Sequence, residues 1–258
     1  MISDDPNLEI RLATREVDLL GAQRLRYRVF VEELGGDGPL VDHAARLERD
    51  AFDPHYDHLV LIDHRRPTES FDHVVGVYRL MPGDRAAQAG GFYCAAEYDL
   101  DRLIGAGRPI LELGRSCVDA QFRGGSAMYL LWTALADYIA ERGIEVLFGV
   151  ASFHGTDIGA LSNALSFLHH RHLAPDDLRV RAVEGAFQPM DLVPADQVDR
   201  RAAMQSIPAL IKAYLRMGGF VGEGAFIDHA FNTTDVCLVM DIDRIAPRQR
   251  ALYARETA

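Results

Sequence analysis

The sequence is poor in cysteine and in positive charge. Its three cysteines, Cys94, Cys117 and Cys237, are spread over 258 residues. An odd number at wide spacing excludes a zinc-finger type of site and a disulfide framework, and predicts a reducing cytoplasm. The 27 basic and 38 acidic residues give a formal net charge of −11. That balance excludes general nucleic-acid binding and a polybasic membrane anchor.

Long apolar runs, internal repeats and low-complexity segments are also missing. No stretch approaches the roughly 20 apolar residues of a membrane span. The first residues, "MISDDPNLEI", are acidic and contain no apolar signal core. We therefore predict a cytoplasmic protein, and we leave peripheral association with the inner face of the membrane open. With 48% hydrophobic residues, the chain can build a substantial core.

What is present is an alternation of strand and helix patterns. Strand patterns cover residues 8–13, 58–63, 73–81, 110–118, 144–151 and 234–242. Helical patterns cover residues 15–34, 126–142, 157–172 and 200–217, the last interrupted by Pro208. Residues 82–96 are predicted to form a loop. These patterns predict an α/β (α+β) fold with a central mixed sheet flanked by helices. We expect a single domain over residues 1–258, with a C-terminal extension from about residue 175.

The stretch "ILELGRSCVDAQFRGG", residues 110–125, places Glu112 and Arg115 inside an apolar strand. Buried strands rarely carry charges that are neither paired nor used. The two residues are either a structural ion pair or a catalytic base with a substrate-orienting cation. Strict alternation puts them on opposite faces of the sheet. A bulge at Gly114 would bring both to one side.

The same stretch ends in the turn "QFRGGSAM" before a helix. The pattern fits a plain turn, and it also fits a phosphate cradle built from helix N-terminal amides with Arg123 adding charge. Cys117 lies in an apolar strand, where a cysteine usually packs and seldom reacts. His169 and His172 share a helix face, but two histidines do not complete a metal site. We predict no metal.

Two further segments carry polar or apolar signals. Asp50, Asp53 and Asp57 in "DAFDPHYDH" would bind an amine together with Arg79, or would only solvate a loop. The segment "IPALIKAYLRMGGF" would line an acyl-chain tunnel or lie on a membrane surface. A plain core helix is the default for the second segment.

Together these motifs resemble the GNAT acyltransferase superfamily and, within it, the bacterial ornithine lipid N-acyltransferases. The resemblance rests on "LRYRVFVEELG", "FDPHYDHLVLID", "VGVYRLMP", "LELGRSCVDAQFRGG", "LLWTALADYIAERGIEVLFGVASFHGTD" and "FNTTDV". A more distant resemblance runs to the acyl-homoserine-lactone synthases and to N-acyl amino acid synthases. The turn departs from the superfamily pattern, since Gln121-x-x-Gly124-x-Ser126 fits its coenzyme A motif only loosely.

The resemblance implies an N-acyltransferase that moves a 3-hydroxyacyl group from acyl carrier protein to the α-amine of L-ornithine, the first step of ornithine lipid synthesis. The carrier's phosphopantetheine thioester is then a co-substrate, and no cofactor is implied. An alternative acceptor is glycine or another amino acid. A second alternative is S-adenosylmethionine with later lactone formation. A non-enzymatic alternative is a degenerate protein that only binds the carrier.

The resemblance also assigns roles to residues. Glu112 is the expected base, with Arg115 beside it. Acceptor binding falls to Arg79, Asp50, Asp53 and Asp57. Donor binding falls to the amides near Cys117 and Val118, and to Arg123, Gly124, Gly125 and Ser126 for the pantetheine phosphate. Docking of the carrier falls to Arg24, Arg28 and Arg171, with Arg26 and Arg123 as further candidates. The apolar side chains expected to shelter the acyl chain are Phe148, Phe153 and Leu165.

Overall fold

The computed structural model describes residues 5–245 and divides into two compact units. Of the described residues, the first unit holds 5–90 and 112–143, and the second holds 91–111 and 144–245. The division after residue 143 does not coincide with the extension expected from about residue 175. The single domain therefore stays a prediction, and each unit is described by itself.

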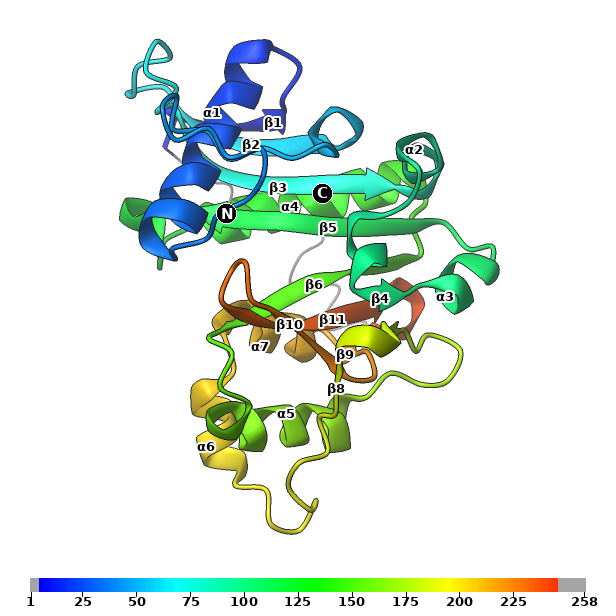
Figure 1. The fold of residues 1–258 in the computed structure, drawn as a ribbon. Coiled ribbons are helices and arrows are strands. Elements are labelled where there is room, and N and C mark those ends of the chain that lie inside the picture. Colours follow the sequence, from blue (N-terminus) through cyan, green and yellow to red (C-terminus); the bar gives the residue numbers. More distant parts are fainter. Residues whose placement is uncertain (1–4, 246–258) are drawn as a thin grey trace. The chain divides into compact units, whose positions relative to one another are not determined.

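Four strands of the first unit neighbour one another in the order β1-β2-β3-β5 (Figure 1). They are β1 (Leu8–Leu12), β2 (Asp57–Asp63), β3 (Val74–Pro82) and β5 (Ile110–Val118). β2 pairs antiparallel with both β1 and β3. The strands predicted at residues 58–63 and 73–81 are therefore confirmed, and they form an antiparallel pair.

Helices cover both faces of these strands. They are α1 (Glu16–Arg26), which continues as a π-helix (Tyr27–Glu33), α2 (Gly83–Ala89) and α4 (Ala127–Arg142). Short 3-10 turns span Asp53–His55 and Ala120–Phe122.

The two long helices pack by different means. The apolar stripe of α1 buries Ala22 and Leu25 against Val60 and Val77, as the helical spacing of residues 15–34 requires. On the other face α4 packs against β1, β2 and β3. There a Cβ on Gly76 would lie 3.1 Å from Leu131 Cδ1, so the small residue lets the helix approach.

The second unit has its own strands and helices. Its strands follow the order β6-β11-β10-β8, with β9 also on β11 and a separate β4–β7 pair. The strands are β4 (Tyr98–Asp99), β6 (Val146–His154), β7 (Arg181–Ala182), β8 (Phe187–Gln188), β9 (Phe220–Val221), β10 (Ala225–Asp228) and β11 (Thr233–Asp241). The helices are α3 (Asp101–Gly105), α5 (Ile158–His172), α6 (Arg200–Ser206) and α7 (Ala209–Arg216). Further 3-10 turns span Tyr93–Ala96, Glu184–Ala186 and Ile242–Arg244.

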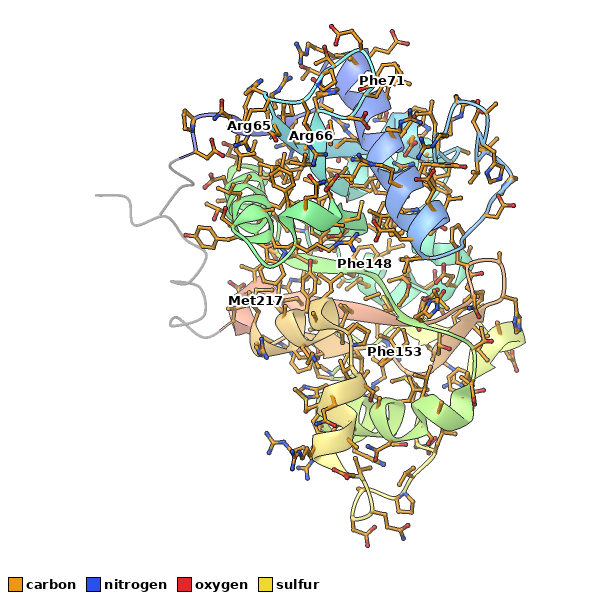
Figure 2. All side chains as sticks on the ribbon, turned by 90° about the vertical axis from the view of Figure 1, so that its left-hand side faces the viewer. Arg65, Arg66, Phe71, Phe148, Phe153 and Met217 are labelled. Carbon is orange, nitrogen blue, oxygen red and sulfur yellow. The ribbon has the colours of Figure 1, made fainter. Side chains whose placement is uncertain are left out.

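The side chains expected to shelter an acyl chain lie in the core of this unit. Phe148 and Phe153 project from β6 (Figure 2), and both are buried, as is Leu165 of α5. The edge of the Phe92 ring meets Phe148 with 4.9 Å between centroids. An acyl tunnel along these residues remains a prediction.

The apolar segment after residue 206 is a core helix, the default interpretation. Pro208 separates α6 from α7, and Ile211 and Tyr214 of α7 are buried. Across residues 5–245, no helix combines the length and apolar character needed to cross a membrane. The predicted loop at residues 82–96 was wrong in part, because α2 occupies Gly83–Ala89.

Candidate active site

Arg26 is the centre of a buried charge cluster in the first unit. It is the last residue of α1 and is 0% exposed. Its guanidinium pairs with the Glu48 carboxylate and donates to both Asp53 oxygens, at 2.7 and 2.9 Å. It also donates to the Glu48 carbonyl at 2.7 Å. Three acceptors thus hold one fully buried cation in place, as a buried charge requires.

Arg79 supplies the second buried cation. It lies on β3, on the face that carries Val77, and is also 0% exposed. One guanidinium nitrogen donates to Asp50 Oδ2 at 2.7 Å and to Asp53 Oδ1 at 2.8 Å. Its guanidinium carbon lies 4.2 Å from the centre of the Tyr56 ring, a cation–π contact.

Arg115 reaches this cluster because the backbone of β5 is irregular there. Its φ is +46°, in the left-handed region that few residues other than glycine occupy. Its Nε lies 3.2 Å from Glu48 Oε1, and a terminal nitrogen lies 3.8 Å from Asp50 Oδ2. The irregularity thus brings Arg115 to the same cluster as Glu112. It is centred on Arg115 and not on the expected Gly114.

Glu112 is tied to the cluster through Tyr56. The Tyr56 hydroxyl donates to Glu112 Oε2 at 2.6 Å, and Glu112 is 1% exposed. Tyr56 directly follows the 3-10 turn that carries Asp53. A single short loop therefore holds both a ligand of the two buried arginines and the partner of Glu112. The predicted base, the predicted cations and the acidic loop are brought together.

The arginines lower the pKa values of two carboxylates of the cluster, those of Asp53 and Glu48. Burial by itself would raise the pKa of Asp53, but Arg26 and Arg79 outweigh it and hold that pKa far below its ordinary value. Burial likewise opposes ionisation of Glu48, and Arg26, Arg115 and Arg79 lower its pKa. Three arginines face four carboxylates, namely Glu48, Asp50, Asp53 and Glu112. The formal charge of the cluster is therefore −1.

His58 is a neutral neighbour of this cluster. It lies on β2, and its Nε2 is 3.0 Å from the Asp53 carbonyl oxygen. Burial is the largest cause that lowers its pKa to about 4, and the Arg26 charge adds to it. At neutral pH the imidazole is therefore uncharged, and its Nε2 hydrogen donates to that carbonyl.

The glycine-rich turn before α4 is open to an anion. Gly124 has φ +77°, and α4 begins at Ala127 after Ser126, whose side chain makes no capping hydrogen bond. Helix N-terminal amides attract phosphate groups. The Arg123 side chain binds other residues of the protein. It pairs with Glu33 at 2.7 Å and donates through Nε to the Val118 carbonyl at 2.9 Å.

Asp57 and Cys117 also lie outside the cluster. Asp57 accepts from Arg85 at 2.6 Å and from the Tyr138 hydroxyl of α4 at 2.9 Å, so it does not join Asp50 and Asp53. Cys117 is buried in the core beneath α1. Burial raises the pKa of its thiol to about 12, which disfavours the thiolate that a nucleophile needs. The expected roles of the amides near Cys117 and Val118 stay predictions.

Two of the three arginines expected to dock the carrier already have partners. Arg24 donates to the carbonyls of Ala45 and Arg46. Arg28 pairs with Asp72 at 3.3 Å and with Asp119 at 3.0 Å. Arg171 belongs to the second unit. Their docking role stays a prediction.

The sequence analysis did not place four residues in the cluster: Arg26, Glu48, Tyr56 and His58. The expectation that Arg26 docks the carrier is wrong, because its side chain is 0% exposed and pairs with Glu48 and Asp53. A signal for Arg26 was present, since it lies four residues after Ala22 and three before Val29, on the apolar face of the helical pattern. A charge on that face demands a buried partner. Within the described chain, no three His, Cys, Asp or Glu side chains are grouped so as to hold a metal ion.

Comparison with known proteins places this site in a family. A domain described as "Acetyltransferase (GNAT) domain" matches residues 25–133, which include Arg26, Arg79 and Glu112. The L-ornithine N(alpha)-acyltransferase of Rhodobacter capsulatus is 61% identical over 247 residues, covering 96% of this chain and 95% of that protein.

Two solved structures show the same fold. FeeM, an N-acyl amino acid synthase from uncultured soil microbes, has a TM-score of 0.53 at 12% identity, covering 96% of this chain and 95% of that one. The acyl-homoserine-lactone synthase LasI has a TM-score of 0.51 at 17% identity, covering 95% and 94%. The fold and the site thus define an N-acyltransferase of the GNAT class, which confirms the expected fold. The chain belongs to the L-ornithine N(alpha)-acyltransferase family.

Proposed function

We propose that this chain transfers a 3-hydroxyacyl group from acyl carrier protein to the α-amine of L-ornithine, the first step of ornithine lipid synthesis. The observation that carries the proposal is the 61% identity, over nearly the whole chain, to an L-ornithine N(alpha)-acyltransferase. The buried cluster supports it, because a carboxylate beside paired arginines suits proton removal from an amine next to a carboxylate group.

The charge of the cluster suits ornithine as the acceptor. Ornithine carries two ammonium groups and one carboxylate at neutral pH, a net charge of +1, and the cluster has a formal charge of −1. Asp50 and Arg115 retain 18% and 17% side-chain exposure, while Arg79 has none. In this proposal Arg115 holds the acceptor carboxylate, Asp50 holds an ammonium group, and Arg79 positions Asp50 and Asp53.

Glu112 is the proposed base. The free amine attacks the thioester carbonyl carbon, and the nitrogen gives up a proton to the Glu112 carboxylate as the C–N bond forms. The C–S bond then breaks, and the carrier thiolate leaves and takes up a proton. Tyr56 donates to Glu112 Oε2 and fixes the direction of the carboxylate. The net products are an amide and a free carrier thiol.

We assign binding of the acyl donor to the end of β5 and the turn that leads into α4. The amides of Gly124, Gly125 and Ser126 at the start of α4 would bind the pantetheine phosphate, with Arg123 exchanging Glu33 for it. The amides near Cys117 and Val118 would hold the thioester oxygen. Arg24 and Arg28 would meet the acidic carrier. The acylated product is amphiphilic, and the proposal includes release at the inner face of the membrane.

The test is an acyl-transfer assay with purified protein. A 3-hydroxyacyl carrier protein is mixed with ornithine, glycine, lysine or S-adenosylmethionine, and products are identified by mass spectrometry. The matching 3-hydroxyacyl-CoA is run beside it. We expect N-acylornithine from the carrier-bound donor. Product with another acceptor only would replace ornithine, and equal turnover of the CoA thioester would remove the carrier preference.

Two variants separate chemistry from folding. Glu112→Gln keeps the size of the side chain and removes the base, so turnover should fall by about 10²–10⁴-fold. Glu9→Gln is the matched control, because Glu9 lies on β1 in an exposed pair with Arg11 and is outside the cluster. No product from any acceptor with a verified donor would contradict the enzyme and favour a protein that only binds the carrier.

A further inference from the structure

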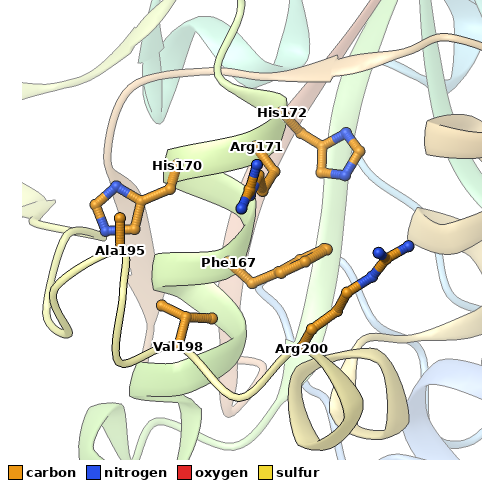
Figure 3. Close-up of a pocket in the computed structure, with 7 residues that line it drawn as sticks. All are labelled: Phe167, His170, Arg171, His172, Ala195, Val198 and Arg200. Carbon is orange, nitrogen blue, oxygen red and sulfur yellow. The ribbon is translucent and has the colours of Figure 1, made fainter.

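A cavity in the second unit has a composition that the acyl transfer reaction does not use. It has a volume of about 350 Å³, within the range of small-molecule sites, roughly 300–1,000 Å³. Its lining comes from the last turn of α5 and from the segment leading into α6 (Figure 3). The lining residues are Phe167, His170, Arg171, His172, Ala195, Val198 and Arg200.

The described residues that line the cavity include two arginines and no carboxylate. Several other arginines of this unit form ion pairs, such as Arg108 with Asp241 at 2.8 Å and Arg179 with Asp176 at 2.9 Å. Within residues 5–245, neither Arg171 nor Arg200 has a carboxylate at ion-pair distance, and both are exposed to solvent. In a chain of net charge −11, the cavity thus presents two arginines that an anion can reach.

The helix termini explain only one of the two arginines. Arg171 lies in the last turn of α5, where the partial negative charge of the helix end favours a cation. Arg200 is the first residue of α6, where the same effect is unfavourable. The adjacent Asp199 is already used, since its side chain accepts from the amides of Arg201 and Ala202. An external anion would therefore stabilise Arg200.

The pKa of His172 responds to the positive charge at the cavity. Its pKa is lowered, first by burial and then by the charges of Arg171 and Arg200. Both guanidiniums therefore act on this imidazole. His170 closes another side, with Nε2 at 2.9 Å from the Val193 carbonyl oxygen. Phe167 is buried and, with Val198, gives the cavity an apolar wall.

We infer that this cavity binds a phosphate ester, with Arg171 and Arg200 on the phosphate and the organic part against Phe167 and Val198. The planar guanidinium fork matches phosphate oxygens. The apolar wall favours an ester over a bare inorganic ion. A soluble phosphate ester and the headgroup of an anionic phospholipid share this chemistry. No residue of the cavity belongs to the charge cluster of the first unit, so phosphate binding and acyl transfer are measured in separate assays.

The experiment measures thermal stability and binding of the full chain with defined probes. The probes are sn-glycerol 3-phosphate, inorganic phosphate, and glycerol as the uncharged control. Vesicles of phosphatidylglycerol are compared with vesicles of phosphatidylcholine. For a protein of this size we expect glycerol phosphate at several times its Kd to raise the Tm by about 2–4 °C. Binding only to phosphatidylglycerol vesicles would assign the site to the headgroup.

Variants decide whether the cavity is responsible. Arg200→Gln, which leaves the predicted docking residue Arg171 in place, should lose the Tm rise and the selective vesicle binding, while acyl transfer continues. Arg201→Gln is the matched control, because Arg201 is the next residue of α6 and does not line the cavity. Equal responses in the native protein and in Arg200→Gln would overturn the inference. So would an unchanged phosphate response together with a raised KM for the carrier, which would assign this cavity to carrier docking.

Discussion

At the scale of single residues, the hydrogen bond from Tyr56 to Glu112 is the contact most directly coupled to chemistry. It is 2.6 Å long and charge-assisted. A bond of this kind contributes about 1.5–3 kcal/mol. Tyr56→Phe removes it and keeps the ring that packs against Arg79. We predict that kcat falls by about 10- to 100-fold with KM little changed, measured by steady-state kinetics.

The split between kcat and KM separates this effect from a structural one. Tyr56→Phe leaves Arg115 and Asp50, the proposed acceptor ligands, in place, so KM should change little while kcat falls. Tyr138→Phe is the matched control, since its hydroxyl donates to Asp57 outside the cluster. Equal losses of kcat in both variants would argue against a positioning role for Tyr56.

Arg26 is predicted to matter for stability as much as for function. Arg26→Leu leaves Glu48 and Asp53 buried without their main partner, and breaking such a pair costs about 3–5 kcal/mol. Arg46→Leu is the control, because its pair with Glu32 is exposed and should contribute about 0–1 kcal/mol. Urea denaturation measures both. A loss of less than about 1 kcal/mol in the free energy of unfolding of Arg26→Leu would contradict its place at the centre of the buried cluster.

At the scale of elements, the turn before α4 is held by glycine geometry. Gly124 has φ +77°, and a Cβ there would meet nothing within 4 Å. Gly124→Ala therefore introduces backbone strain without a clash, at a cost of about 1 kcal/mol. We predict a Tm lower by a few degrees and a raised KM for the acyl donor.

The control for that change is a glycine in ordinary helical geometry. Gly105→Ala in α3 meets nothing within 4 Å and needs no positive φ, so it should hold or slightly raise the Tm. Calorimetry and donor titration on both variants test the prediction. An unchanged KM for the acyl donor in Gly124→Ala would show that this turn does not bind the donor.

Periodicity shows which elements the sequence predicts well. The long segments α1, α4, α5, β3 and β11 have clear helical or strand spacing and were predicted within a few residues. The elements β8, β9 and β10 have two to four residues, too few to establish a period. α2 was missed because "GDRAAQA" has little apolar contrast.

The candidate site was predicted in part, for a related reason. Glu112, Arg115, Arg79, Asp50 and Asp53 stood out as charges in or beside apolar strands. Arg26 was expected on the surface as a docking residue, and only its place on the buried face of α1 distinguishes it from Arg24 and Arg28. Glu48 and Tyr56 lie in an irregular loop, where no periodicity reports which way a side chain points.

At the scale of the whole molecule, the buried groups predict how stability depends on pH. His58 has a folded pKa of about 4 against an ordinary value of 6.5. Between these values the unfolded chain binds the extra proton, so stability falls as pH is lowered from 6.5 towards 4. The share of His58 is on the order of 3 kcal/mol. The lowered pKa values of Glu48 and Asp53 add a further loss at more acidic pH.

This prediction is measured by calorimetry across the pH range. His58→Gln should flatten the dependence of Tm between pH 6.5 and 4 and keep the loss at lower pH. His64→Gln is the control, because His64 is exposed. Within residues 5–245, its one ion pair is with Glu9. An unchanged slope in His58→Gln would show that the proton uptake occurs elsewhere.

The most direct test of the account is to locate the acylated nitrogen. Ornithine labelled with heavy nitrogen at the α position alone is incubated with 3-hydroxyacyl carrier protein, and the product is fragmented in the mass spectrometer. The account predicts that the acyl group is on the labelled nitrogen in the native protein, and that Glu112→Gln yields almost no product. Acylation of the δ nitrogen, or turnover by Glu112→Gln at the native rate, would contradict it.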